Sequence, residues 1–509
     1  MSVCPVVDEG PYLKLQVQLP KDAATRAVPK GGETGDGTED GIRHENELKN
    51  VMVFIIRNGY NFDSPSATPF VFKGYVDDSD PTKWTATAYG VDVTFPVGTY
   101  IPQHGDRVIV VANAGNLLGL YNNLGELRDG TSYLPWRNGS SLAANDLFVM
   151  TSAYNNGEGS VNVLLHHGTE ADPFLSELHI QRAAARIDFM YKETANFSGT
   201  APTTELFYTV KNSTGTQDLA TVHLQNIIPF NLMQQPSYLI KRVATTITSP
   251  LTVNHGAMEE TTGSPLYQPT NYVVEPHTLL KQSVVSDATL NAWYGSTRAQ
   301  TVFSNPTPYL STTGISNYVA THTPKAELGY FTHYMTLAYT NENTQSKEKH
   351  SPDFMTGLLL KTIYEPKVVY ADKDKTPYSP MSAYATGRTF WRYSPTKGGM
   401  KEEDCLYFEN EMAATGYQAE HPTDLAVIEK FPDGVCYYNI WLRHANVDSD
   451  PHVTFPMEYG IVRNNIYRVG VETITGPGSA TPSLEAPEHA HLRIFVRPWN
   501  LREQPVIRL

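Results

Sequence analysis

The stretch Tyr12-Leu-Lys-Leu-Gln-Val-Gln-Leu-Pro20 decides the fold that this sequence predicts. Aliphatic and polar residues alternate along it, so an extended chain places all the aliphatic side chains on one face. These aliphatic residues are Leu13, Leu15, Val17 and Leu19. Pro20 has no backbone N–H to donate to a neighbouring strand. The pattern therefore predicts a β-strand with one buried side that ends at Pro20.

A glycine-rich segment, residues 23–41, follows this strand. Its glycines stand among small and acidic residues, and Arg26 lies near its start. Because such a composition cannot bury a core, we expect a flexible tether that proteases can reach. An ordinary first strand followed by a surface loop is the alternative interpretation.

The composition is typical of a β-rich protein with many turns. The chain has 509 residues, of which 18% are charged, and this length favours two or more domains. A net charge of -14 argues against nucleic acid or anionic lipid as a partner. No apolar run is long enough to cross a bilayer. We also find no recognisable signal peptide, so an exported protein would be represented here in processed or truncated form.

Apolar patterns predict strands along the whole chain. Residues 48–56 are almost continuously apolar, which predicts a central strand. Asn116 is a candidate N-cap for a short helix that would contain Leu117, Leu120, Tyr121 and Leu124. Residues 178–190 are extended at both ends with small residues between, and we interpret them as the crossing between two β domains. The other predicted strands are 107–112, 147–151, 161–166, 206–210, 220–229, 355–370, 436–442 and 466–473.

Residues 245–343 show no sustained periodicity and predict long loops between short strands. The chain then ends much as it begins. A Pro-rich linker, residues 481–487, precedes residues 491–499, where Leu492, Ile494 and Val496 alternate with other residues. The pattern predicts a final strand at the end of a linker.

Motifs for enzymatic chemistry are missing from the sequence. It has no phosphate-binding loop, no His-Glu-x-x-His and no Gly-x-Ser-x-Gly. His166-His167 and the pair His489 with His491 are candidate metal ligands. Adjacent histidines on a strand point to opposite faces, however, and the second pair lies on a segment that we expect to be mobile. We therefore expect no catalytic residues, no metal and no cofactor. We interpret carboxylate pairs such as Glu402-Glu403 and Glu259-Glu260 as solvent-exposed residues of surface loops.

The three cysteines show no disulfide framework. Cys405 and Cys436 could pair in an oxidising compartment. Cys4 could carry a lipid, although Val3 fits poorly before a lipid-bearing cysteine. The sequence leaves both possibilities open.

Several stretches together resemble the FimA-like fimbrillins, the type V pilins of Bacteroidales, and most closely their larger minor-fimbria stalk subunits. The N-terminal strand with Thr25-Arg26-Ala27 and the tether resembles the N-terminal arrangement of that family. Residues 111–116 resemble its turn and residues 182–188 its interdomain crossing. Three stretches resemble the C-terminal signature of the family: Tyr437-Tyr-Asn-Ile-Trp-Leu-Arg-His444, residues 457–467, and the tail that ends in Val496-x-x-Trp499.

The resemblance implies an all-β chain of two tandem β-sandwich domains, of transthyretin-like, Greek-key type, with a few short helices. It divides the chain into a tail with a removable strand (1–26), an N-terminal sandwich (27–185), a C-terminal sandwich with long loops (186–480) and a donor-strand segment (481–509). It also implies export as an outer-membrane lipoprotein and later incorporation into a cell-surface fimbrium for adhesion and biofilm formation.

The resemblance further implies maturation by an Arg-specific, trypsin-like protease. The family motif carries the cleavage onto the bond after Arg26, which leaves Ala27 as the new N-terminus; Arg43 is the second choice. The removable strand would contain Leu13, Leu15, Val17 and Leu19. The donor strand from another copy would contain Leu492, Ile494, Val496 and Trp499.

Burial energies make this mechanism reasonable. Burying each aliphatic side chain of the first strand is worth roughly 1.5 to 3 kcal/mol, which in sum rivals the net stability of a typical domain. Cutting the tether would let the strand leave, and a strand from another chain could fill the groove. Such a contact does not close on itself and builds a filament with other pilus subunits.

Other functions remain open. A tip or anchor subunit is the rival within the family, and a surface glycan-binding lipoprotein is the rival outside it. The adhesion ligand and the role of residues 245–430 are not determined by the sequence.

Overall fold

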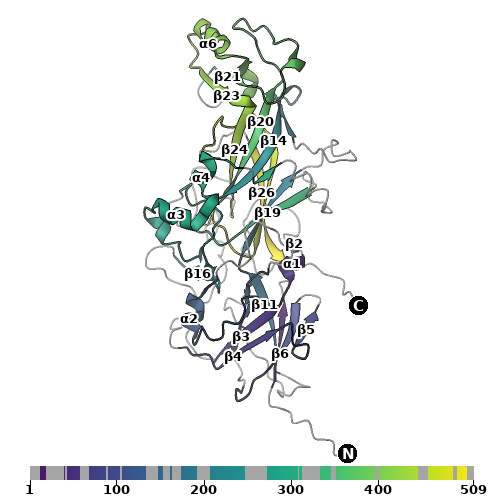
Figure 1. Ribbon diagram of the computed structural model, residues 1–509, viewed down its shortest axis with the longest axis vertical. Coiled ribbons are helices and arrows are strands. Elements are labelled where there is room, and N and C mark those ends of the chain that lie inside the picture. The colour runs from purple at the N-terminus through teal and green to yellow at the C-terminus, as the bar shows by residue number, and fades with distance from the viewer. Residues whose placement is uncertain are drawn as a thin grey trace, which may run out of the picture.

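The chain folds into an elongated all-β molecule with a few short helices, as predicted (Figure 1). The computed structural model describes residues 12–18, 39–40, 43–57, 68–87, 90–101, 103, 106–132, 147–152, 161–162, 174–191, 207–246, 272–307, 309–311, 333–345, 351–395, 401–444, 457–484 and 490–500. In Figure 1 the strands β3, β4, β5, β6 and β11 lie at one end of the long axis, β14, β20 and β24 extend towards the other, and β2 lies between them.

Nine of the described strands up to residue 182 form one sheet, and the other two, β2 and β8, pair with strands of the second half of the chain. The order of this sheet is β4-β3-β7-β9-β11-β1-β6-β5, and β10 pairs with β7. The strands are β1 (Tyr12–Gln18), β3 (Asn50–Ile56), β4 (Phe72–Asp77), β5 (Trp84–Thr87), β6 (Gly90–Pro96), β7 (Arg107–Ala112), β9 (Met150–Ser152), β10 (Val161–Asn162) and β11 (Phe174–Arg182).

This sheet folds over on itself to make the N-terminal sandwich. Side chains from the β1–β6 half and from the β3–β7 half belong to a single buried cluster, for example Val93 and Val110. Where β4 passes close to β6, a Cβ atom on Gly74 would lie only 2.7 Å from the Phe95 ring. Only glycine therefore allows the two halves to approach this closely.

The predicted central strand is confirmed, because β3 lies between β4 and β7 and is buried on both faces. Its second face is covered by α2 (Leu124–Asp129) through Leu124 and Leu127. The helix begins later than predicted: Asn123 is the N-cap, and its side chain accepts a hydrogen bond from the Glu126 N–H. The side chain of Asn116 instead accepts from the Leu118 N–H in a turn.

Asn113 explains the turn after β7. It has a left-handed backbone (φ 61°), which asparagine tolerates better than most residues. Its side chain donates to the carbonyl oxygens of Glu47 and Phe148, at 2.7 and 2.9 Å, and accepts from the Lys49 N–H. One amide group thus joins three segments of the N-terminal sandwich.

Two sheets form the C-terminal sandwich. The first has the order β19-β12-β25-β26-β2, and the second has the order β13-β14-β20-β24 with β18 on β14. The first contains β12 (Ala185–Tyr191), β19 (His333–Thr340), β25 (Asn465–Ile474), β26 (Ala490–Asn500) and β2 (Glu39–Asp40). The second contains β13 (Phe207–Lys211), β14 (Asp218–Phe230), β18 (Leu310–Ser311), β20 (Gly357–Pro366) and β24 (Val435–Trp441).

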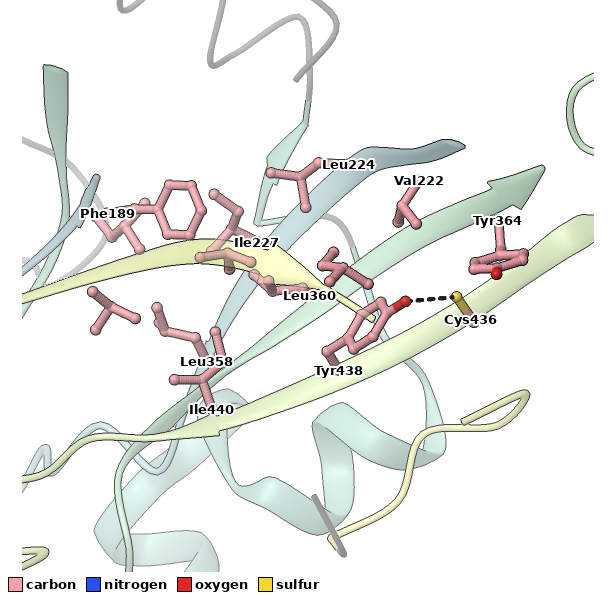
Figure 2. Close-up of a cluster of buried hydrophobic side chains, with 14 of the residues drawn as sticks. Phe189, Val222, Leu224, Ile227, Leu358, Leu360, Tyr364, Cys436, Tyr438 and Ile440 are labelled. Carbon is pink, nitrogen blue, oxygen red and sulfur yellow. Dashed lines mark hydrogen bonds between the residues drawn. The ribbon is translucent and has the colours of Figure 1, made fainter. Parts of the chain in front are cut away.

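The core of this sandwich lies between the two sheets. Alternating residues of β14, β20 and β24 point into it, among them Val222, Leu360 and Tyr438 (Figure 2). They meet Phe189 from β12 and Val469 from β25 in the same buried cluster. Along β14 the burial alternates up to Asn226, and from Ile227 onward the strand is buried on both faces, the second face in a separate apolar cluster with Ala299 and Val302.

Some elements were not predicted. A small three-stranded sheet of β21 (Phe390–Ser394), β22 (Leu406–Phe408) and β23 (Val427–Phe431), with α6 (Glu411–Glu420), projects from the far end of the C-terminal sandwich (Figure 1). The helices α3 (Asp287–Tyr294) and α4 (Ala299–Ser304) lie within residues expected to be loops. All three helices are short, and their apolar positions are too few to give a strong periodicity.

Short strands join the N-terminal sandwich to the second half of the chain. β8 (Thr131–Ser132) follows α2 and pairs with β15 (Ser237–Tyr238), which belongs to the second half of the chain. Close to them, β16 (Arg242–Ala244) pairs with β17 (Tyr272–Val274).

Candidate functional site

The first strand is an inner strand of the N-terminal sheet. β1 pairs antiparallel with β6 from Tyr12 to Gln18, and parallel with β11 from Leu13 to Gln18. Backbone groups on both of its edges are therefore used in the sheet. Loss of β1 would expose one edge of β6 and one edge of β11, and unpaired strand edges readily accept another strand.

The aliphatic face of β1 is fully buried. Leu13, Leu15 and Val17 have no exposed surface and belong to the core cluster of the N-terminal sandwich. Together they contribute roughly 5 to 9 kcal/mol before conformational entropy is considered. On the opposite face, the Lys14 ammonium forms a partly exposed ion pair with Asp92 at 3.0 Å.

Several predicted site residues lie outside the described residues. These are Cys4, Leu19, Arg26 and Ala27. The described chain resumes at β2, where Glu39 and Asp40 pair in parallel with Trp499 and Asn500 of β26. The far end of the predicted tether therefore runs beside the C-terminal strand.

A buried carboxylate fixes the segment that follows the tether. Glu45, in α1 (Arg43–Asn46), forms an ion pair with Arg186 of β12 at 3.0 Å. The Tyr339 hydroxyl donates to the same carboxylate at 2.6 Å, and the Arg182 Nε donates to the backbone oxygen of Glu45 at 2.8 Å. Burial, and then the Glu45 charge, raise the pKa of Tyr339 well above its ordinary value, so this hydroxyl stays protonated.

The same network continues into the C-terminal sandwich. Asp188 accepts two hydrogen bonds from Arg186, at 2.9 and 2.8 Å, and a third from the Nε of Arg468 in β25. None of these side chains is exposed. Removal of one partner would leave an uncompensated buried charge, so the network holds its members in place.

Glu45 was missed by the sequence analysis, although both arginines of the crossing 182–188 were noted. Two arginines among alanines at a junction between sheets are expected to be buried, and buried arginines need hydrogen-bond acceptors. The sequence therefore indicated that an acidic partner exists, without indicating which residue it is. A single Glu in a short polar segment carries no pattern that identifies it as the acceptor.

The predicted donor strand is present as β26, paired within its own chain. It runs antiparallel to β25, from Ala490 opposite Ile474 to Pro498 opposite Asn465. The predicted donor residues Leu492, Ile494 and Val496 stand opposite Val471, Val469 and Tyr467, and Trp499 stands opposite Glu39. Along its other edge, the described residues pair with β26 only at β2. Most of that outer edge thus has no strand neighbour among the described residues.

Glu402 corrects one expectation, since it was interpreted as solvent-exposed. It is 6% exposed, and the guanidinium of Arg392 pairs with it at 2.6 Å, while the Tyr407 hydroxyl also donates to it. Burial raises the pKa of Glu402 despite the neighbouring Arg392. Glu403 beside it accepts from Ser213 on the surface, as expected. Residues 259–260 lie outside the described residues.

The cysteines that could have paired are both free thiols. Cys405 and Cys436 are buried, and burial raises the pKa of both, that of Cys436 to about 11. The Cys436 thiol is 3.1 Å from the Thr362 hydroxyl, inside the C-terminal core.

Among the described residues, no group of three potential metal ligands comes together, and no helix is long and apolar enough to cross a membrane. His166, His167 and His489 lie outside the described residues. Large hydrophobic side chains exposed in the described part of the chain are aliphatic or methionine, and none is aromatic. The tyrosines of the middle region instead include core residues such as Tyr294, Tyr364 and Tyr393.

Comparison with known proteins identifies the C-terminal region. Residues 429–505, which include β24, β25 and β26, match the family model of the major fimbrial subunit protein type IV, fimbrillin, C-terminal. This match confirms the resemblance of the C-terminal region to the fimbrillins. No curated protein has a significantly similar sequence.

Solved structures of fimbrial proteins are also similar to this chain. One is the fimbrillin FimA from Porphyromonas gingivalis W83, with 15% identity, a TM-score of 0.38, and coverage of 98% of this chain and 100% of that chain. Another is the tip fimbrial protein Mfa3 from Porphyromonas gingivalis with a C-terminal truncation, with 11% identity, a TM-score of 0.39, and coverage of 96% of this chain and 100% of that chain.

Proposed function

The C-terminal region of this chain matches the fimbrillins, and we propose that the chain is a shaft subunit of a cell-surface fimbrium that polymerises by strand exchange. The observation that carries the proposal is the position of β1. It is an inner strand of the N-terminal sheet with a fully buried aliphatic face, yet it lies at the start of the chain and precedes a glycine-rich tether. Once the tether is cut, β1 is no longer linked through it to the rest of the domain and is held by its pairing with β6 and β11 and by its buried side chains.

Cleavage is proposed after Arg26 by an Arg-specific, trypsin-like protease, because the family motif falls on Thr25-Arg26-Ala27. Arg43 is a poorer substrate, since it begins α1 two residues before the buried Glu45. Cleavage favours exposed, flexible chain, and opening α1 would disturb the Glu45 ion pair. We also propose that the precursor is an outer-membrane lipoprotein, with Cys4 as a candidate lipid carrier.

The segment after the cleavage site stays in place in this mechanism. Glu45 and Arg186 join α1 to the C-terminal sandwich without any contribution from β1. Release of β1 would therefore open a groove between β6 and β11 while the rest of the N-terminal sandwich keeps its connections.

The donor of the exchanged strand is proposed to be β26 from another copy. Its sequence has the alternation that the groove requires, and it lies at the end of the chain, after a Pro-rich linker. Within the chain it is held by β25 and, at its end, by β2. Because donor and groove lie on different parts of the subunit, the contact repeats from copy to copy and builds a filament.

A tip or anchor subunit is the second candidate within the family. A tip subunit has no further subunit to complement, so its last strand would remain with its own sandwich. The long β26, with its regular register on β25, fits either role before assembly. A glycan-binding role receives less support, because the described residues expose no large aromatic side chain.

Limited trypsin digestion tests the proposal. We expect the first new N-terminus to be Ala27, and we expect the cleaved protein to form filaments and ladders that resist SDS. Because trypsin also cuts after Lys21 and Lys30, the Arg26→Ala variant is treated with a protease that cuts only after arginine, and it should then stay monomeric. Lys14→Ala, on the opposite face of β1 from the core, should assemble normally. A first cut outside residues 21–43, with no change in assembly, would contradict the proposal.

A further inference from the structure

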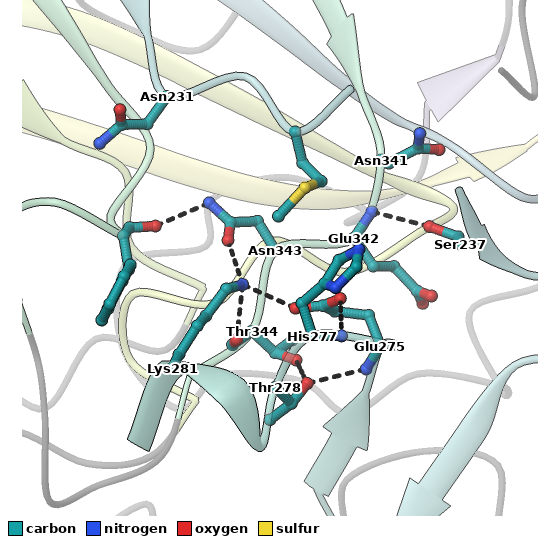
Figure 3. A network of polar contacts seen from close by, with 12 residues as sticks. Asn231, Ser237, Glu275, His277, Thr278, Lys281, Asn341, Glu342, Asn343 and Thr344 are labelled. Carbon is teal, nitrogen blue, oxygen red and sulfur yellow. Dashed lines mark hydrogen bonds and ion pairs between the residues drawn. The ribbon is translucent and has the colours of Figure 1, made fainter. Parts of the chain in front are cut away.

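Lys281 lies in a closed polar network inside the C-terminal half of the molecule (Figure 3). Its ammonium nitrogen donates to Glu275 Oε1 at 2.6 Å, to Asn343 Oδ1 at 2.6 Å and to the Thr344 backbone oxygen at 2.9 Å. Lys281 has no exposed surface, and Glu275 and Asn343 are 3% and 2% exposed. An amine, a side-chain amide and a carboxylate are thus held together out of water.

The amine and the amide are close enough to react. Since a C=O bond is about 1.23 Å long, a nitrogen 2.6 Å from Oδ1 is less than about 4 Å from the carbonyl carbon Cγ of Asn343. Reacting atoms in a near-attack arrangement are about 3 to 3.5 Å apart. A shift of a few tenths of an ångström would bring Lys281 Nζ into this range of distances from Cγ.

The amide is held in one orientation. Asn343 Nδ2 donates to the Phe354 backbone oxygen at 2.7 Å and to the Thr356 hydroxyl at 2.9 Å. These two acceptors fix which atom of the amide is nitrogen, so Oδ1 must face Lys281. The Tyr294 hydroxyl also points to Oδ1, at 3.4 Å, where it can donate to negative charge that develops on this oxygen.

The buried surroundings make the Lys281 ammonium easier to deprotonate. Trp293, Tyr294 and Phe354 belong to one buried apolar cluster, and the Trp293 ring centre is 5.8 Å from Lys281 Nζ. Burial lowers the pKa of Lys281, although the Glu275 charge acts in the other direction. A neutral amine is the nucleophilic form of lysine.

Glu275 is placed to move the proton. Its Oε1 accepts from Lys281 Nζ, and its Oε2 accepts from the His277 N–H at 2.6 Å. The Glu275 N–H donates to the Thr278 hydroxyl at 2.9 Å, which fixes the backbone beneath the carboxylate. The carboxylate can therefore take a proton from the amine and later return one.

We propose that Lys281 and Asn343 form an intramolecular amide bond, with Glu275 as the proton carrier. Lys281 Nζ attacks Cγ of Asn343, the new C–N bond forms, and the bond from Cγ to Nδ2 breaks. Glu275 accepts a proton from Nζ, and Nδ2 receives a proton and leaves as ammonia. The sum is one ammonium and one carboxamide giving one secondary amide and one ammonium ion, so no oxidant or other reactant is needed.

The bond would join two segments that are distant in the chain. Lys281 lies in η4 (Leu280–Gln282), after β17, and Asn343 follows β19 and forms an isolated bridge with Ile461. The link would close a loop of 62 residues that contains α3 and α4. Cross-linking a long loop restricts the unfolded chain and so stabilises the folded one. The inference does not depend on the proposed strand exchange.

Mass spectrometry of the purified, full-length protein tests the inference. We expect the intact mass to be lower than the sequence mass by one ammonia molecule. Because cyclisation of an asparagine also releases ammonia, the protein should then be digested and searched for a branched peptide that contains both Lys281 and Asn343. Recovery of separate, linear peptides with Lys281 and Asn343 unmodified, from folded wild-type protein, would overturn the proposal.

Variants assign the roles. Glu275→Gln keeps the size of the side chain but cannot carry the proton, so we expect complete loss of the branched peptide and an unreduced mass. Lys281→Arg should also lose it, while Glu403→Gln, at a surface carboxylate, should keep it fully. If Glu275→Gln fails to fold, the wild-type peptide map still decides whether the bond exists. A branched peptide in Lys281→Arg or an equal yield in Glu275→Gln would contradict the assignment.

Discussion

Glu45 and Arg186 form an ion pair of 3.0 Å, although 141 residues separate them in the sequence and neither side chain is exposed to solvent. The pair joins the segment after the tether to the first strand of the C-terminal sandwich. It lies in a network with Asp188, Arg468 and the Tyr339 hydroxyl. The segment from α1 onward is therefore fixed by contacts that do not include β1.

Substitution of Glu45 by Gln should destabilise the protein strongly. The change keeps the shape of the side chain but leaves excess positive charge among buried arginines, at an expected cost of about 3 kcal/mol. Urea unfolding followed by tryptophan fluorescence would measure the loss. The matched control is Glu47→Gln, because Glu47 pairs with Lys49 where both side chains are partly exposed, and we expect a loss below about 1 kcal/mol there. Similar losses for the two variants would contradict the role of Glu45.

The strands could be predicted from the sequence largely because their patterns are local. The alternation in β1 follows from its one buried face. The continuous apolar run in β3 follows from its two buried faces. The extended ends and small middle of residues 178–190 correspond to β11, a short connection and β12. Each of these features is encoded within about ten neighbouring residues.

The partners of buried polar groups could not be predicted in the same way. Glu45 meets Arg186, and Lys281 meets Asn343, only after distant segments have come together. Glu402 was even interpreted as surface, since a run of acidic residues on a loop usually faces water. Its burial depends on Arg392, which lies ten positions away on β21. Local composition carries no information on such pairings.

Substitution of Leu15 by Ala should weaken the attachment of β1. Leu15 is completely buried in the N-terminal core, and loss of its side chain leaves a cavity that costs about 2 to 5 kcal/mol. The uncut protein should unfold at lower urea, and after trypsin cleavage the N-terminal peptide should be released faster, as measured by size-exclusion chromatography. Gln16→Ala, on the opposite face of β1, is the control and should change stability by less than about 0.5 kcal/mol. No difference in release between the two variants would argue that β1 is not held by its aliphatic face.

The thiols of Cys405 and Cys436 should react only after unfolding. Burial raises the pKa of Cys436 to about 11, so at pH 8 it is a protonated thiol without access to reagents. Iodoacetamide labelling without reductant, followed by peptide mass analysis, should modify neither residue in the native state and both in urea. Because the folded pKa lies above the ordinary value of about 8.5, this thiol stabilises the fold below that pH and loses its contribution as the pH rises towards 11. A Cys405–Cys436 disulfide would instead leave both unlabelled in urea.

A reversible lock on β1 provides the most direct test of strand exchange. Gln16 of β1 stands directly opposite Asp92 of β6, and opposite residues in antiparallel strands are close enough for a disulfide. In a Cys4→Ser background, Gln16→Cys with Asp92→Cys should give a protein that trypsin cuts normally but that keeps its first strand. Assembly, followed by electron microscopy and SDS ladders, should be absent under oxidising conditions and should return on addition of dithiothreitol. The single variant Gln16→Cys controls for the reductant and should assemble in both conditions. Filaments of equal number from the locked protein would mean that the groove of β1 is not the acceptor, because a groove that is still occupied cannot receive a strand from another copy.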